Sequence, residues 1–433
     1  MGSLDRVSVE PPWVRAWTGG LPAVHVGNVA EFNAVFGGIP AVCDHYSCLA
    51  AFGSPWPALI VLPLPVQQWW IRHLAATLGW GEVRVRGGLA AEGQGAAALA
   101  GLPEIVSPEV AVLPWGRTPA FDRIRPAPAG VLDCIRRFES KRGSHELFRE
   151  LAPDHPRIRI AAQRRVASRR ELKAVAMPYV LKEEYGVGGA GTRVVATPPA
   201  PRRVRGLLLE EYIEPVANPT FDAVIAADGQ VHPVGTGAMT IDGTRYQGVT
   251  IGPGTLPTEQ VQTAAAFGAA VGAALASRGY RGWYDVDFVA DRTGVLVPIE
   301  INLRLTGPAV AFTIQAALDR LHGAGHVVRT LDCLPLGARL PSAALREHVT
   351  RLAAHCQELG TILLVTIPTA AFDPFPYLGI ALAAQTIEGL DEAERAIRTA
   401  NEALGAMFTL PDPERVVSAV GGRRRRRAPL RQS

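Results

Sequence analysis

Two short segments of alternating polarity within residues 282–308 constrain the fold of this chain more than any other feature. The first, Gly-Trp-Tyr-Asp-Val-Asp-Phe-Val-Ala, places Asp285 and Asp287 two residues apart, and therefore on one face of a strand. The second, Val-Leu-Val-Pro-Ile-Glu-Ile-Asn-Leu-Arg-Leu-Thr-Gly-Pro, does the same for Glu300, Asn302 and Arg304. The Asp-Arg-Thr-Gly sequence between them favours a hairpin turn. The sequence thus predicts a hairpin with acids, an amide and a guanidinium on one face.

The polar face of this hairpin predicts a cation site. Carboxylates that lie so close together repel one another unless a cation separates them, and hard oxygen donors favour Mg²⁺, which keeps part of its coordination shell for substrate phosphates. The alternative interpretation is an ordinary hairpin with one solvated face. On the opposite face, five apolar side chains are expected to enter a core: Val286, Phe288, Ile299, Ile301 and Leu303.

The length and composition of the chain indicate a soluble globular protein of two to three domains. It has 433 residues, of which 48% are hydrophobic and 19% charged. The longest apolar run, Ala58 to Val66, contains two prolines and is too short to span a membrane. The first residues contain no apolar signal region, and five scattered cysteines suit a reducing compartment. We therefore expect a cytoplasmic protein that does not act at a membrane.

The formal net charge of +4 arises from the C-terminus. Six of the 44 basic residues are Arg423 to Arg427 and Arg431, so the rest of the chain has 38 basic against 40 acidic residues. A short run of like charges is typical of a disordered tail, here residues 412–433. Because the body has no basic stripe with aromatic residues, we expect no nucleic-acid partner.

Residues 1–138 are predicted to form an α/β domain. Strand-like runs alternate with a helix at Val66–Gly79, and they cover Ala23–Val29, Ala58–Pro65, Glu82–Arg86 and Glu109–Leu113. The sequence Cys43-Asp-His45-Tyr-Ser-Cys48 offers metal-ligating side chains but has no second ligand pair at zinc-site spacing, so a structural role is favoured.

A glycine-rich segment at residues 178–196 combines a lysine with the literal dinucleotide spacing G-x-G-x-x-G. That fingerprint requires a helix after the glycines. Here β-branched residues and then prolines follow, which predicts a strand, a glycine-rich turn and a second strand. Such a flap can fold over phosphates with its free N–H groups, and Lys182 adds a positive charge. The P-loop sequence G-x-x-x-x-G-K-[ST] does not occur.

Further elements are predicted along the rest of the chain. A helix opens near Lys141, Ser168 to Glu171 form a capping box, and a strand ends in acids at 206–215. A hairpin over 220–237 and a helix over 256–279 lead into the polar hairpin. Arg245 to Gln247 are placed in a glycine-rich loop, for which a plain connection and a contact that orients a substrate carboxylate are equal alternatives. After 331, helices at 341–359 and 391–404, the latter with Asp391 near its cap, alternate with strands at 361–367 and 379–387 in a small α/β domain that extends to 411.

The order of these motifs resembles the ATP-grasp superfamily, and within it the carboxylate–amine ligases. The segment Pro-Ile-Glu-Ile-Asn-Leu-Arg-Leu-Thr-Gly is similar to the E-I-N-x-R metal strand of that family. The superfamily pattern covers roughly residues 139–325, within a domain drawn at 139–330 that includes a flap subdomain at about 165–213. The three-part layout resembles the pheganomycin-type peptide ligases, in which a pre-ATP-grasp domain precedes the nucleotide clamp, and this suggests antibiotic biosynthesis.

The resemblance implies roles for individual residues. Lys141 and Lys182 would contact the ATP phosphates, and Lys182 and Arg304 would act at the transferred phosphoryl group. Two Mg²⁺ ions would be bound by Asp287, Glu300 and Asn302, with Asp285 the weaker candidate. Other contacts to ATP would come from the flap and the end of the acidic strand: Gly188, Gly189, Ala190, Gly191, Thr192, Glu210, Glu211, Tyr212 and Ile213. Relatives place a ribose-binding acid a few residues later, where this chain has Asn218.

The implied activity is ADP-forming ligation of an amino-acid-like carboxylate to the amine of an amino acid or peptide, through an acyl phosphate. The substrates would be small molecules, and homodimers are common among similar ligases. Two alternatives stay open at this point. The first is an ATP-grasp enzyme with kinase-like or carboxylase-like chemistry, and the second is an ATP-binding regulatory protein without turnover.

Overall fold

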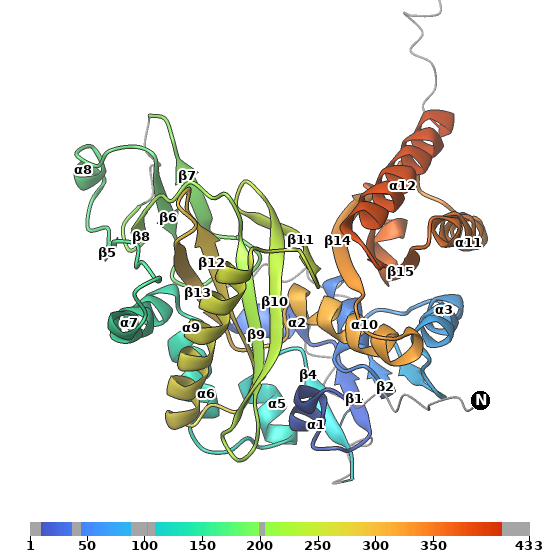
Figure 1. Ribbon diagram of the computed structural model, residues 1–433, viewed down its shortest axis with the longest axis horizontal. Coiled ribbons are helices and arrows are strands. Elements are labelled where there is room, and N and C mark those ends of the chain that lie inside the picture. The colour runs from blue at the N-terminus through green and yellow to red at the C-terminus, as the bar shows by residue number, and fades with distance from the viewer. Residues whose placement is uncertain (1–9, 37–44, 88–101, 103–108, 199–203, 409–433) are drawn as a thin grey trace, which may run out of the picture.

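The computed structural model describes residues 10–36, 45–87, 102, 109–198 and 204–408. Within these ranges the fold is mixed α/β, with three sheets and helices packed around them (Figure 1). Cys43 and Asp44, most of the glycine-rich stretch at 87–101, and the arginine-rich tail lie outside the described residues.

The N-terminal sheet is parallel and has the strand order β3-β2-β1-β4. Its strands are β1 (Ala23–Val26), β2 (Pro57–Val61), β3 (Arg84–Arg86) and β4 (Ala111–Pro114). The helical elements of this part are α1 (Pro12–Thr18), α2 (Val29–Val35), η1 (His45–Phe52), α3 (Gln68–Leu78), α5 (Pro119–Ile124) and α6 (Val131–Phe138). The strands and the helix α3 confirm the predicted alternation of strands and helix. The carboxyl end of β4 contacts the segment that follows β13, because Leu305 N donates to Trp115 O at 2.8 Å.

The central sheet has eight strands in the order β13-β12-β9-β10-β11-β14-β16-β15. Its strands are β9 (Pro219–Ile225), β10 (Val231–Asp242), β11 (Arg245–Ile251), β12 (Gly282–Ala290), β13 (Leu296–Asn302), β14 (Val327–Pro335), β15 (Ile362–Ile367) and β16 (Tyr377–Ala384). Four long helices pack on it: α9 (Thr258–Ser277), α10 (Gly307–His322), α11 (Ser342–Glu358) and α12 (Ile387–Phe408). Because β14 crosses the boundary drawn at 330 and 331, the sheet is continuous from the predicted central domain into the predicted C-terminal one, and the domain limits stay a prediction.

The flap is a separate small antiparallel sheet of order β5-β8-β6-β7. Its elements are β5 (Gln163–Arg165), α8 (Arg169–Leu172), β6 (Tyr179–Lys182), β7 (Thr192–Val195) and β8 (Leu208–Glu211), and α7 (Lys141–Leu151) and η2 (Ala152–Asp154) precede it. A core of its own, which includes Val166, Leu181 and Leu209, holds this sheet together. The predicted strand, glycine turn and strand are therefore confirmed.

Four local predictions are wrong. Ile299 is half-exposed rather than in the core, because the register shifts between Asp287–Glu300 and Phe288–Pro298 and leaves Ile299 as the extra residue of a bulge. Residues 245–247 belong to strand β11, not to a loop, because Arg245 and Tyr246 pair with Asp242 and Ile241 of the neighbouring strand β10. The helix α12 begins at Ile387, so Asp391 lies inside it.

The fourth concerns the capping box: the Ser168 side chain accepts no capping bond, and Glu171 Oε2 instead accepts from Ala167 N, one residue before the cap, at 3.3 Å. In the described part of the chain, no helix combines the length and the apolar character needed to cross a bilayer.

Candidate active site

Three neighbouring strands of the central sheet bring two rows of polar side chains together. The first row crosses β9, β12 and β13 and contains Asp222, Asp285 and Asn302. The second row lies beside it and contains Thr220, Asp287 and Glu300. The Asn302 amide joins the rows, because its Nδ2 donates to Asp285 Oδ1 at 2.7 Å and to Asp287 Oδ2 at 3.3 Å. The predicted pairing of the polar hairpin is confirmed.

The aspartates of these rows are deeply buried and mutually repulsive. Asp222 is fully buried, Asp285 is 1% exposed and Asp287 is 7% exposed. Burial, followed by the charge of Asp285, raises the pKa of Asp222 and of Asp287 well above the usual range. Burial raises the pKa of Asp285 to about 7, although Arg304 and Asn302 oppose the shift. The site therefore favours whatever positive charge can enter it.

Two lysines from different elements bring positive charge to this face. Lys141 begins α7, and its Nζ lies 3.0 Å from Glu300 Oε2, while Lys182 ends β6, and its Nζ lies 2.5 Å from Glu210 Oε1. Both lysines are buried. Burial alone would raise the pKa of Glu300, but the charges of Lys141, Lys182 and Arg304 outweigh it, and the net shift is downward. Glu300 is therefore held as a carboxylate.

Arg304 lies at the end of the hairpin and is 7% exposed. Its Nη2 donates to Asn302 Oδ1 at 2.6 Å, and its Nε lies 3.8 Å from Glu139 Oε1. Its guanidinium carbon is 5.7 Å from the centroid of the Phe32 ring, which comes from α2 of the N-terminal part. Its Nη1 donates to Leu305 O at 3.2 Å, so the guanidinium contacts Asn302, Leu305 and Glu139, and the structure gives it no ion pair with Glu300. The Arg304 Nε is buried without a hydrogen bond to any described residue.

The acidic end of β8 lies beside Lys182. Glu210 is 5% exposed, and its Oε2 accepts from Gln163 Nε2 at 2.8 Å. Glu211 is exposed and pairs with Arg159. Three further residues that were predicted to contact the nucleotide, Tyr212, Ile213 and Asn218, follow β8 and are half-buried.

The glycine turn of the flap reaches the turn between β10 and β11. Thr244 Oγ1 donates to Thr192 O at 3.3 Å, and a Cβ added to Gly189 would lie 1.7 Å from Thr244 O. Gly188, Gly189 and Gly191 have φ of 58°, 84° and 77°, which a side chain rarely tolerates. The base of the turn contacts α7, since Lys141 Nζ donates to Gly186 O at 3.4 Å. The flap, both lysines and the hairpin therefore form one site.

The donor set of the hairpin fits a divalent cation. Asp287 Oδ1 is buried and has no hydrogen-bond partner among the described residues, which leaves a carboxylate oxygen directed at no protein donor. Glu300 and the Asn302 carbonyl, which accepts from Arg304 Nη2, would offer further hard oxygen donors to such an ion. Within the described ranges no group of three His, Cys, Asp or Glu side chains has metal-site spacing, and the predicted set contains two carboxylates and an amide.

Sequence reasoning missed three residues of this site. The first is Asp222, which accepts from Trp283 Nε1 at 2.9 Å. Its place as the one acid in the apolar run Thr-Phe-Asp-Ala-Val-Ile could have indicated a functional role. Glu139 accepts from Leu303 N at 2.6 Å, and burial raises its pKa. Gln163 had no signal, because its role depends on the pairing of β5 with β8.

Two comparisons with known proteins find similarity to the ATP-grasp fold. Residues 139–308, which contain the lysines, the flap and the hairpin, match the family model described as an ATP-grasp domain. The fold is therefore a mixed α/β fold with an ATP-grasp domain. No curated protein sequence matches the chain.

Solved structures with the same fold belong to several enzymes. A carboxyaminoimidazole ribonucleotide synthase from Aspergillus clavatus, solved with ATP, has 14% identity and a TM-score of 0.51 over 81% of this chain and 99% of that one. An L-amino acid ligase from Bacillus licheniformis has 16% identity and a TM-score of 0.51 over 73% and 86%. A biotin carboxylase from Campylobacter jejuni has 12% identity and a TM-score of 0.51 over 92% and 97%. At these identities the likeness concerns the fold.

Proposed function

We propose that this protein is an ATP-dependent, ADP-forming ligase that couples an amino-acid-like carboxylate to the amine of an amino acid or peptide. The observation that carries the proposal is the meeting of Lys141 and Lys182 with the acid rows of the hairpin beneath a glycine flap. A site for nucleotide binding alone has little need of three buried cations, Lys141, Lys182 and Arg304, whose charges all lower the pKa of Glu300.

Each group has a role in this proposal. Lys141, Lys182 and the flap backbone hold the phosphates, and Glu210 and the residues after it hold the adenine and ribose. Asp287, Glu300 and Asn302 hold Mg²⁺, which supplies charge neutralisation at the transferring phosphoryl group when bound. Arg304, fixed by Asn302 and Glu139, lies beside that group.

The chemistry follows from the poor reactivity of a carboxylate. Transfer of the γ-phosphoryl group to the substrate carboxylate gives ADP and an acyl phosphate, and attack by the amine then expels phosphate and forms the amide. The lysines and Arg304 stabilise the charge that develops during both steps. The flap excludes water, because an acyl phosphate hydrolyses readily.

The ion pairs of the site imply an exchange of partners on binding. Lys141 is paired with Glu300, and Lys182 with Glu210, so a lysine that binds a phosphate exchanges its carboxylate partner for it. Binding of Mg²⁺ by Glu300 would release Lys141 towards the nucleotide. In this scheme metal and nucleotide bind cooperatively.

The choice of carboxylate and amine as substrates rests on the motif order and on the three-part layout, which resembles the pheganomycin-type peptide ligases. The carboxyl ends of β1 and β4, where open parallel sheets bind ligands, lie next to Leu305 and Arg304. We therefore place the carboxylate and amine between the N-terminal sheet and the hairpin. A cytoplasmic location and a homodimeric state are part of the same proposal, and sizing by light scattering tests the latter.

Phosphate release and product mass test the function. With panels of amino acids and short peptides, phosphate release should require ATP, Mg²⁺, a carboxylate and an amine, and the product should have the mass of the amide. Glu300→Gln and Lys182→Ala should lower the rate at least about a hundredfold. Lys173→Ala, at an exposed position in the same flap subdomain, serves as the control.

Other outcomes separate the alternatives. Full activity in Glu300→Gln or Lys182→Ala would contradict the site. A phosphorylated or carboxylated product without an amide would show the same fold with different chemistry. Calorimetric binding of ATP without turnover on any substrate panel would show a binding protein.

A further inference from the structure

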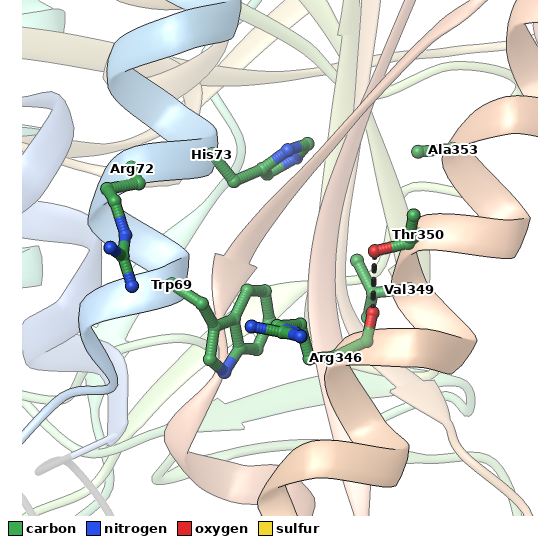
Figure 2. Close-up of a pocket in the computed structure, with 7 residues that line it drawn as sticks. All are labelled: Trp69, Arg72, His73, Arg346, Val349, Thr350 and Ala353. Atoms are coloured by element: carbon green, nitrogen blue, oxygen red, sulfur yellow. Dashed lines mark hydrogen bonds between the residues drawn. The ribbon is translucent and has the colours of Figure 1, made fainter.

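A second polar cavity lies away from the hairpin, between α3 of the N-terminal part and α11 of the C-terminal part. It has a volume of about 530 Å³ and is lined by Trp69, Arg72, His73, Arg346, Val349, Thr350 and Ala353 (Figure 2). Both helices pack near β15, at the opposite end of the central sheet from β12 and β13 (Figure 1). The volume falls in the range of sites for small metabolites, about 300 to 1,000 Å³.

The cavity is positively charged. Arg72 lines the cavity from α3, and Arg346 extends from α11 towards α3 (Figure 2). Neither arginine makes an ion pair with an acid among the described residues, whereas Arg351, on the same helix α11, lies 3.8 Å from Glu347. Two unpaired guanidiniums from facing helices match an anion with several oxygens, because each offers a fork of N–H donors.

Two further side chains of the cavity have unused hydrogen-bonding groups. Trp69 Nε1 is buried and has no partner among the described residues. His73 Nε2 lies 3.2 Å from Leu363 O, so it must carry the proton, and burial lowers the pKa of His73 and keeps the ring neutral. The Nδ1 atom of His73 is then an acceptor, and it suits a hydroxyl or amine on the body of the ligand.

We propose that this cavity binds a small organic anion, a phosphate or carboxylate that carries a hydroxyl or amine, at a site separate from the nucleotide site. Arg72 and Arg346 hold the anionic end, and Trp69 and His73 contact the remainder. Since the two walls come from parts of the chain about 270 residues apart, a bound anion ties the N-terminal part to α11 and stabilises the whole protein.

Isothermal titration of the full chain tests the proposal with two probes, inorganic pyrophosphate and citrate, which separate phosphate from carboxylate ligands. At least one probe should bind and raise the melting temperature. The double variant Arg72→Gln/Arg346→Gln should bind that probe at least tenfold more weakly. Arg351→Gln is the control, because it removes one positive charge from α11 at a residue that does not line the cavity.

Pyrophosphate can also enter the nucleotide site, so a Lys141→Met/Lys182→Met variant is titrated in parallel. Retained binding there supports the second site. Binding that disappears in the lysine variant but persists in the arginine variant would overturn the proposal. Failure of both probes to bind at millimolar concentration, or equal weakening by Arg351→Gln, would overturn it as well. All variants change exposed or site-lining side chains, and their melting curves report whether they fold.

Discussion

The acids of β9 and of the hairpin bring more negative charge to one face than the neighbouring lysines and Arg304 neutralise. Asp222, Asp285 and Asp287 are buried on one face, and only Glu300 has a lysine within ion-pair distance. Buried acids that have hydrogen bonds but no ion-pair partner cost folding free energy, either through repulsion or through the proton that they must take up. Such strain persists where function requires it, and it makes the site responsive to cations.

The first prediction concerns Asp287. Asp287→Asn removes a buried charge whose Oδ1 lacks a partner, so we expect the free energy of unfolding without Mg²⁺ to rise by about 1 to 3 kcal/mol. Calorimetry with and without MgCl₂ checks this. The wild type should be stabilised by the ion and the variant should not. Asp242→Asn, at an exposed position, should leave the magnesium response unchanged, and a variant that still responds like the wild type would rule out Asp287 as a ligand.

The second prediction concerns Asp332, a buried acid of β14 whose carboxylate accepts from Tyr46. Burial raises its pKa from 3.8 to about 7. The folded protein therefore retains a proton that the unfolded chain loses near pH 4, so the contribution to stability is complete below pH 4 and is lost as the pH rises through about 7.

Asp332→Asn removes this dependence. At pH 8 the variant should be more stable than the wild type, by about 4 kcal/mol at most, and the two should converge near pH 4. Urea titrations at a series of pH values measure this difference, with Asp228→Asn in an exposed turn as the control. Parallel pH curves for wild type and variant would show that Asp332 is ionised throughout.

At the scale of elements, the flap is positioned by short contacts at both ends. Ser140 caps α7 by accepting from Gly143 N at 3.2 Å and also donates to Glu184 Oε1 at 3.0 Å, so the helix that carries Lys141 holds the base of the flap. At the tip, Gly189 lies against the backbone of Thr244. A side chain at the tip would therefore lift the flap from the sheet.

The third prediction uses two adjacent glycines with positive φ. A Cβ at Gly189 would lie 1.7 Å from Thr244 O, whereas one at Gly188 would have no heavy atom within 4 Å. Both alanine variants carry the backbone strain of about 1 kcal/mol, but only Gly189→Ala collides with backbone. We expect Gly189→Ala to raise the KM for ATP at least about tenfold, and to raise ATP hydrolysis without amide formation, because the flap no longer excludes water. Steady-state kinetics on both variants provide the comparison, and equal effects would show that the flap tip does not need this contact.

At the scale of the whole molecule, the predicted domains share cores and strands. Trp70 Nε1 of α3 donates to Val365 O of β15 at 2.7 Å, and one core extends from the N-terminal helices through α10 to α12. His45 lies 3.0 Å from Asp373, across more than 300 residues of chain. Contacts of such separation make the parts depend on one another for stability.

The fourth prediction concerns truncation. A fragment that ends at residue 330 would lose β15, β16 and most of β14, and so expose the edge of β11 and the apolar faces of α3 and α10. We expect it to be insoluble or partly unfolded, whereas a chain that ends at 411 should melt in one transition like the full chain. Circular dichroism and limited proteolysis decide between these outcomes. A stable fragment of 1–330 would show that the domain limit at 330 is a real boundary.

Local pattern in the sequence determined a large part of this structure. Alternation of polar and apolar residues specified the strands β12 and β13, and glycine with β-branched neighbours specified the flap, because these signals depend only on residues near in the chain. The bulge at Ile299 and the strand nature of residues 245–247 escaped prediction, because each depends on the partner strand.

Which acids, lysines and amides meet was decided only by the tertiary structure. The sequence placed Asp287, Glu300 and Lys182 on their own elements. The contacts of Glu300 with Lys141, of Glu139 with Arg304 and of Trp283 with Asp222 each join segments tens to hundreds of residues apart. Strand register and helix packing set those distances, and no local periodicity encodes them. Sequence by itself therefore determined the chemistry available to this protein, and the packing of its sheets decided where that chemistry is assembled.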